Sequence, residues 1–152
     1  MTASVWMAFL HHVAAFALVA CIAIELVLLR PPIDLQRARR LLAVDAVVGL
    51  AAGTVVVAGV LRVLRFDKGV DWYLSNGAFH AKMGLFVLVA LLSLYPTVRF
   101  LSWRHALRRG EAPVIDDAGI ARLRRVVHLE LAGIVLVLLA AAAMARGTFM
   151  LE

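Results

Sequence analysis

Four long apolar segments constrain the fold of this chain more than any other feature of its sequence. They run from about residues 5–29, 41–64, 78–98 and 126–145. Each is long enough to cross the hydrocarbon core of a membrane, which takes about 20 residues of helix. Because 64% of all residues are hydrophobic, against about 45–50% in soluble domains, an ordinary globular domain is excluded. We therefore expect residues 1–152 to form a single all-α integral membrane domain, a bundle of four transmembrane helices.

Turn-forming residues separate the four segments. Pro31-Pro32 follows the first segment, Asp67-Lys68-Gly69 follows the second, and the third connection includes the stretch from Gly110 to Gly119. Pro and Gly are the strongest local signals for a break in regular structure. The sequence therefore predicts that helices end at these three places.

The distribution of Lys and Arg predicts how the helices are oriented. Eleven of the sixteen basic residues fall in the connections that follow the first and third apolar segments. Because cytoplasmic loops are enriched in Lys and Arg, we expect both termini outside and these two loops in the cytoplasm, as in a bacterial inner membrane. Loops this short cannot form a folded basic face, so the net charge of +6 does not indicate a nucleic-acid partner.

Ionisable side chains inside the apolar segments are candidate functional residues, because charges are costly to place in a membrane. The expected orientation sorts them into two layers at different depths. The outer layer contains His11, His12, Arg62, His80 and Lys82. The inner layer contains Glu25, Asp45, His128 and Glu130.

The outer layer has the residue types that a heme site requires. His11 lies in the first helix and His80 near the start of the third, so their imidazoles are expected at matching depth. Opposed histidines on neighbouring helices are suited to be axial ligands of heme b. His11 and His12 are about 100° apart on a helix, so only one would bind the iron. Arg62 and Lys82 would pair with the propionates, or would only extend to the membrane surface.

The inner layer supports two interpretations. Glu25 follows His11 by fourteen residues, so both lie on one face of the first helix, about 21 Å apart. A carboxyl group this deep needs a partner, and the candidates are Asp45, His128 and the arginines that begin the fourth helix. His128 and Glu130 are about 200° apart, so only one of them is expected to point inward. The layer is either a proton-handling or ligand site, or a buried ion pair that fixes helix registry.

A stripe of small residues marks one face of the second segment. Gly49 and Gly53 form a small-xxx-small pattern, which lets helix backbones approach closely. The pattern is consistent with packing inside the bundle, with a homodimer through these glycines, or with room for a flat macrocycle.

Motifs of soluble enzymes are missing from the chain. It has no P-loop, dinucleotide fingerprint, nucleophile elbow or His-Glu-x-x-His sequence. Cys21 is the single cysteine, which excludes an intrachain disulfide and a cysteine-based metal site. The candidates are therefore confined to the intramembrane residues.

Several stretches of the sequence carry a family resemblance. Residues 72–104 contain Gly77-Ala78-Phe79-His80-Ala81-Lys82-Met83 and Tyr95-Pro96-Thr97-Val98-Arg99-Phe100. Residues 9–12 read Phe-Leu-His-His, and residues 25–30 read Glu-Leu-Val-Leu-Leu-Arg. In these stretches the chain resembles a bacterial family of small, uncharacterised four-span membrane proteins, a domain of unknown function. The resemblance covers nearly the whole chain.

A more distant resemblance is to the HemJ-type membrane protoporphyrinogen oxidases. Those proteins have Leu-His near the start of the first helix and His-x-Lys at the start of the third, where this chain has Leu10-His11 and His80-Ala81-Lys82. The resemblance implies bound heme b, an oxidoreductase activity and functional roles for the two histidines and the lysine. Copper-export membrane domains of the CopD type are similar in a different way, with histidines near the outer ends of helices.

Three residues depart from the HemJ pattern: the intramembrane acids Glu25 and Asp45, and His12 beside the matching histidine. The loops differ from those of HemJ as well, so the substrate does not carry over with the resemblance.

Together these observations favour an inner-membrane protein that binds heme b and takes part in electron transfer or porphyrin oxidation. A quinone or a respiratory protein would be its redox partner. The alternatives are a cofactor-free transport protein, a protein that handles copper or another metal, and a small membrane assembly subunit. The expected site residues are His11, His12, His80 and Arg62 for the heme, Lys82 and Glu25 for catalysis, and Glu25, Asp45, His128 and Glu130 for the proton route.

Overall fold

The computed structural model describes residues 2–66 and 68–150, and this part of the chain is helical without a β-strand. Its long helices are α1 (Ala3–Leu28), α2 (Leu35–Leu61), α4 (Gly77–Ser102) and α6 (Asp117–Ala145). The short elements are the π-helix η1 (Arg62–Phe66), α3 (Val70–Leu74) and α5 (Arg104–Arg108). All four long helices are long and apolar enough to cross a membrane. The predicted four-helix membrane bundle is therefore confirmed.

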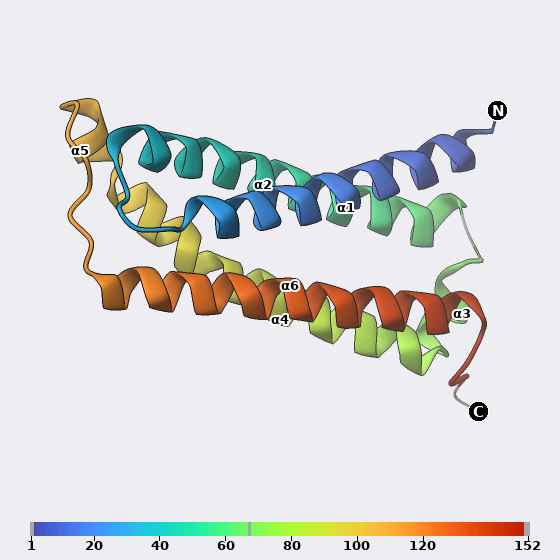
Figure 1. Ribbon diagram of the computed structural model, residues 1–152. Helices are drawn as coiled ribbons and strands as arrows, with labels where there is room; N and C mark the ends of the chain where they lie inside the picture. Colours follow the sequence, from blue (N-terminus) through green and yellow to red (C-terminus); the bar gives the residue numbers. More distant parts are fainter. Residues whose placement is uncertain (1, 67, 151–152) are drawn as a thin grey trace.

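The four long helices form two layers (Figure 1). Helix α1 packs mainly on α2, and α4 packs mainly on α6. The layers meet through the smaller contacts of α1 with α6 and of α2 with α4. The start of α1, the end of α6 and helix α3 lie at one end of the bundle, which we call the terminal end. The loop between α1 and α2 and helix α5 lie at the opposite end, which we call the arginine end (Figure 1).

The most completely buried apolar side chains gather toward the arginine end. Leu29, Leu41, Phe100 and Leu123 come from the parts of four different segments that meet there, and none is exposed to solvent. In Figure 1, α1 and α6 lie close together at this end and diverge toward the terminal end. The tight core therefore holds the layers together at the arginine end.

Helices α2 and α6 begin earlier than their apolar segments predict. Asp34 accepts a hydrogen bond from the backbone N–H of Arg37 at 2.7 Å, and Asp116 accepts one from that of Gly119 at 3.0 Å. Such N-caps satisfy donors that the first helical turn leaves free, and Arg, Leu and Ala are good helix formers. The expected break at Gly119 is therefore wrong, because this glycine lies in the first turn of α6.

The break after the second segment is a turn where the structure describes it. Gly69 has a φ of 87°, a left-handed conformation that favours glycine. Asp67, which belongs to the same predicted break, lies outside the described residues. The turn leads into α3 and then into α4, where Asn76 caps the helix by accepting from the N–H groups of Ala78 and Phe79.

Candidate functional site

A cavity of about 200 Å³ opens at the terminal end of the bundle. Its wall comes mainly from α2, η1 and α4, with single residues from α1, α3 and α6. Most of the lining is aliphatic, aromatic or methionine side chain. Among the described residues of the wall, the charged or imidazole side chains are His11, Arg62 and Lys82. The cavity is therefore apolar with a cationic character.

His11 is held in the cavity wall by α2. Its Nδ1 donates a hydrogen bond to the carbonyl oxygen of Val55 at 3.1 Å. A Cβ atom at Gly59 would lie 3.3 Å from Cε1 of His11, which is a very tight contact. Gly59 thus makes room for the imidazole one helical turn after Val55. The small residues of this helix were expected to serve packing within the bundle, a homodimer or a macrocycle, and room for an imidazole at Gly59 was not among these roles.

Arg62 and Lys82 bring positive charge to the same cavity from two different helices. Arg62 is the first residue of η1, where the helical winding widens after α2, and such π-helical turns often occur at functional sites. Lys82 lies in the second turn of α4 and is half-buried. Both cations act electrostatically on His11. The structure therefore brings together His11, Arg62 and Lys82 from the predicted outer layer.

His12 and His80 do not line this cavity. His12 is exposed and bonds through Nδ1 to the carbonyl of Ala8 at 2.6 Å. His80 is exposed and bonds through Nε2 to the carbonyl of Leu74 at 2.8 Å. Since residues two apart on a helix point about 200° apart, α4 can turn only one of His80 and Lys82 inward, and it turns Lys82.

A heme held between His11 and His80 does not fit this arrangement. His80 is absent from the lining of the cavity, where its imidazole would have to lie to oppose that of His11 across an iron. The geometry of the outer layer thus differs from the one expected for two axial histidines.

A second polar layer lies deeper in the bundle, toward the arginine end. Glu25 of α1 and Glu130 of α6 are each 1% exposed, and Asp45 of α2 is 6% exposed. Helix α4 contributes Thr97, whose hydroxyl donates to Oδ1 of Asp45 at 2.6 Å. Glu25 lies within electrostatic range of both other acids. We call Glu25, Asp45 and Glu130 the acid triad.

The acid triad has no ion-pair partner in the described chain. Oε1 of Glu25 and Oε1 of Glu130 are buried without a hydrogen-bond partner. Arg124, which was a candidate partner for Glu25, instead donates from Nη1 to the carbonyls of Leu26 and Leu29 at the end of α1, at 3.3 and 2.8 Å. Among residues 2–66 and 68–150, the inner layer therefore lacks the buried ion pair that was one interpretation of it.

His128 lies outside the triad. Its side chain is exposed, and its Nδ1 donates to the carbonyl of Arg124 at 2.7 Å. Glu130, about 200° away on α6, is the inward-facing member of the pair. The inner layer thus contains three of the four residues that depth alone assigned to it.

Gly49 and Gly53 face away from the other helices. Both are exposed, and a Cβ atom at either position would meet nothing within 4 Å. Packing inside the bundle is therefore not their role, while the homodimer stays a prediction. The close helix approach occurs elsewhere, at Gly133 of α6, where a Cβ atom would lie 2.5 Å from Cγ2 of Val89 in α4.

Comparison with known proteins gives one family. The family model described as "Predicted membrane protein (DUF2214)" matches residues 3–148, which include all four long helices. No curated protein and no solved structure matches the chain. The expected resemblance to an uncharacterised family of small membrane proteins is confirmed, whereas the HemJ resemblance stays an expectation.

Proposed function

We propose, from the premise that this chain belongs to the DUF2214 family of predicted membrane proteins, that it is a cofactor-free membrane transport protein for a small amphipathic anion. The cavity at the terminal end would be its binding site. The observation that carries the proposal is the composition of this cavity, an apolar wall to which the described residues contribute the cations Arg62 and Lys82. An apolar wall suits a hydrocarbon or aromatic body, and Arg and Lys suit a carboxylate or phosphate group.

His11 would provide the third polar contact. Because its Nδ1 donates to Val55, Nε2 is left to accept a hydrogen bond in the neutral imidazole. A ligand that is both anionic and a hydrogen-bond donor, such as a hydroxylated or partly protonated acid, would use this nitrogen. The same site offers little to a cationic ligand.

The proposed orientation places this cavity at the outer face of a bacterial inner membrane. Support comes from the arrangement of the two basic connections, since the loop after α1 and the segment containing α5 lie together at the arginine end (Figure 1). Under the rule that basic loops stay in the cytoplasm, the terminal end faces outward. The ligand would then enter from outside or leave toward it.

The proposal is tested with a series of ligands that differ only in their polar group. Octanoate, octanol and octylammonium are added to the purified protein in lipid nanodiscs, and the apparent melting temperature is measured. A ligand that binds the folded state raises this temperature. We expect octanoate to raise it most and octylammonium least. Equal shifts for the three compounds would contradict an anion site.

Heme b is the second candidate, and one observation favours it. Metal-binding histidines usually donate their other ring nitrogen to a carbonyl or carboxylate, and His11 donates Nδ1 to the carbonyl of Val55. The HemJ resemblance points to the same histidine. The position of His80 weighs against it. An absorption spectrum of protein from heme-replete cells tests for this cofactor. A bound heme gives a Soret band, and the His11→Ala variant would alter that band.

The remaining alternatives have less support. A site for copper or another metal has no cluster of three His, Cys, Asp or Glu residues within 2–66 and 68–150 in its favour. A role as an assembly subunit has no specific contact in its favour.

A further inference from the structure

We infer that the acid triad of Glu25, Asp45 and Glu130 is a proton-binding site inside the membrane, with protons on Glu25 and Glu130 at neutral pH. The inference goes beyond the anion site and does not rest on it, because the two sites share no residue. It replaces the proton route expected from sequence with a defined set of three carboxyl groups.

The first argument is the position of the carboxyl groups. They come from three helices of both layers, α1, α2 and α6, and are almost completely buried. Asp45 and Glu130 act electrostatically on Glu25, and Asp45 also acts on Glu130. Three negative charges this close in a membrane interior repel one another and lose their hydration. All three groups therefore cannot be ionised together without nearby cations.

The second argument is the scarcity of cations around them. From α6, the guanidinium of Arg124 is bonded to the carbonyls of Leu26 and Leu29, and His128 is exposed on the opposite side. From α5, Arg104 acts on Asp45. Cys21 of α1 and Tyr95 of α4 also pack against the core, but neither side chain supplies positive charge.

The third argument assigns the protons within the triad. Asp45 accepts a hydrogen bond from Thr97 and has Arg104 as a nearby cation, so it is the member best suited to stay ionised. Oε1 of Glu25 and Oε1 of Glu130 accept nothing from the described residues and are buried. A protonated carboxyl group has no net charge to stabilise.

Infrared spectroscopy of the protein in lipid nanodiscs tests this inference directly. A protonated carboxyl group has a C=O stretching band that a carboxylate lacks, and the band shifts in heavy water. We expect the wild-type protein to show this band at neutral pH, and Glu25→Gln and Glu130→Gln each to remove part of it. The matched control is Glu111→Gln, because Glu111 is exposed and paired with Arg109 at 2.7 Å. A wild-type spectrum without the band, or one unchanged in both glutamine variants, would overturn the inference.

A second measurement uses only the wild-type protein, so its result does not depend on whether a variant folds. Apolar carbodiimides dissolve in the membrane and react with protonated carboxyl groups there. Mass spectrometry of the labelled wild-type protein is expected to find the adduct on Glu25 or Glu130 and not on Glu111. Labelling of neither membrane glutamate, under conditions where a control membrane protein with a known protonated carboxyl group is labelled, would overturn the proposal. Neither readout depends on the anion site, so the two proposals fail independently.

Discussion

His11 of α1 and Gly59 of α2 lie so close together that a Cβ atom at residue 59 would stand 3.3 Å from Cε1 of the imidazole. The same imidazole donates to the carbonyl of Val55 at 3.1 Å. One helix therefore provides both the hydrogen-bond acceptor and the space for a side chain of its neighbour. This fixes His11 in the cavity wall, and it makes the position sensitive to a single methyl group.

Gly59→Ala is expected to displace the imidazole and weaken ligand binding. The alanine side chain would push His11 by a few tenths of an ångström and strain its bond to Val55. Alanine also has a higher helix propensity than glycine, by about 0.5–1 kcal/mol. The control must therefore be another Gly→Ala substitution within a helix, so that both variants gain the same helix propensity. Gly84→Ala is that control, because a Cβ atom there meets nothing within 4 Å. Gly59→Ala should show the smaller octanoate-induced rise in melting temperature, and equal rises in the two variants would contradict this account.

Gly133→Ala is expected to destabilise the α4–α6 pair. A Cβ atom at this position would lie 2.5 Å from Cγ2 of Val89, which is itself buried. Overpacking of this kind costs about 1–3 kcal/mol. Adding Val89→Ala should recover part of that loss, because it removes the clashing methyl groups. Thermal unfolding of the single and double variants in detergent checks both statements. A Gly133→Ala variant as stable as the wild type would contradict this prediction, because it would mean that α4 and α6 can move apart at little cost in free energy.

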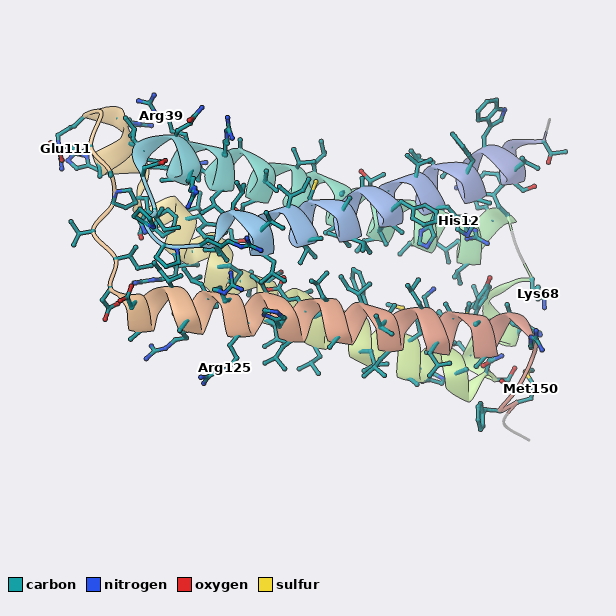
Figure 2. All side chains as sticks on the ribbon, viewed as in Figure 1. His12, Arg39, Lys68, Glu111, Arg125 and Met150 are labelled. Atoms are coloured by element: carbon teal, nitrogen blue, oxygen red, sulfur yellow. The ribbon has the colours of Figure 1, made fainter. Side chains whose placement is uncertain are left out.

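Arg124→Gln is expected to lower stability through the end of α1. The guanidinium donates to the carbonyls of Leu26 and Leu29, and hydrogen bonds from charged groups contribute about 1.5–3 kcal/mol. The control is Arg125→Gln, because Arg125 is exposed and points away from the bundle in Figure 2. We expect Arg124→Gln to lower the melting temperature and Arg125→Gln to leave it nearly unchanged.

A double variant separates two roles of Arg124. If it serves only the carbonyls of α1, its effect on stability adds to that of Glu25→Gln. If the arginine instead neutralises the Glu25 carboxylate, the two effects are strongly non-additive. Additivity is the result that agrees with the protonated acid triad.

The proposed orientation is tested by labelling single cysteines. Cys21→Ser removes the native cysteine, and new cysteines are placed at Thr148 or Glu111, which are both exposed. These positions mark the terminal and arginine ends, where Figure 2 labels Met150 and Glu111. A membrane-impermeant thiol reagent applied to intact cells should label residue 148 and not residue 111. Labelling of residue 111 and not of residue 148 would mean that the proposed cavity faces the cytoplasm.

The sequence predicts the number and approximate place of the helices well, because the apolar length needed to cross a membrane is a strict physical requirement. Helix ends are predicted less well. Arg37 and Arg39 lie inside α2, since arginine favours helix and the Asp34 cap starts it ahead of the apolar run. Hydropathy predicts where a helix enters the membrane, whereas the N-cap residue determines where the helix begins.

The sequence predicts the depth of the candidate residues in the membrane, but it does not predict which side of each helix faces the other helices. Depth alone groups Glu25, Asp45, His128 and Glu130, and the structure gathers all of these except His128. The choice of Lys82 over His80 depends on how α4 is rotated, and this is set by contacts with the other helices. Gly49 and Gly53 show the same limit, because their spacing is favourable for close packing but their face of α2 is exposed.

The most direct test of the proposed function compares two arginines of the same π-helix. Arg62 lines the cavity, whereas Arg65 is exposed and lies outside it. Octanoate binding to Arg62→Gln and Arg65→Gln is measured by titration in lipid nanodiscs. We predict that Arg62→Gln weakens binding about tenfold, as expected when one charged contact of about 1.4 kcal/mol is lost, while Arg65→Gln matches the wild type. Equal affinities for the two variants would contradict the assignment of this cavity as an anion site.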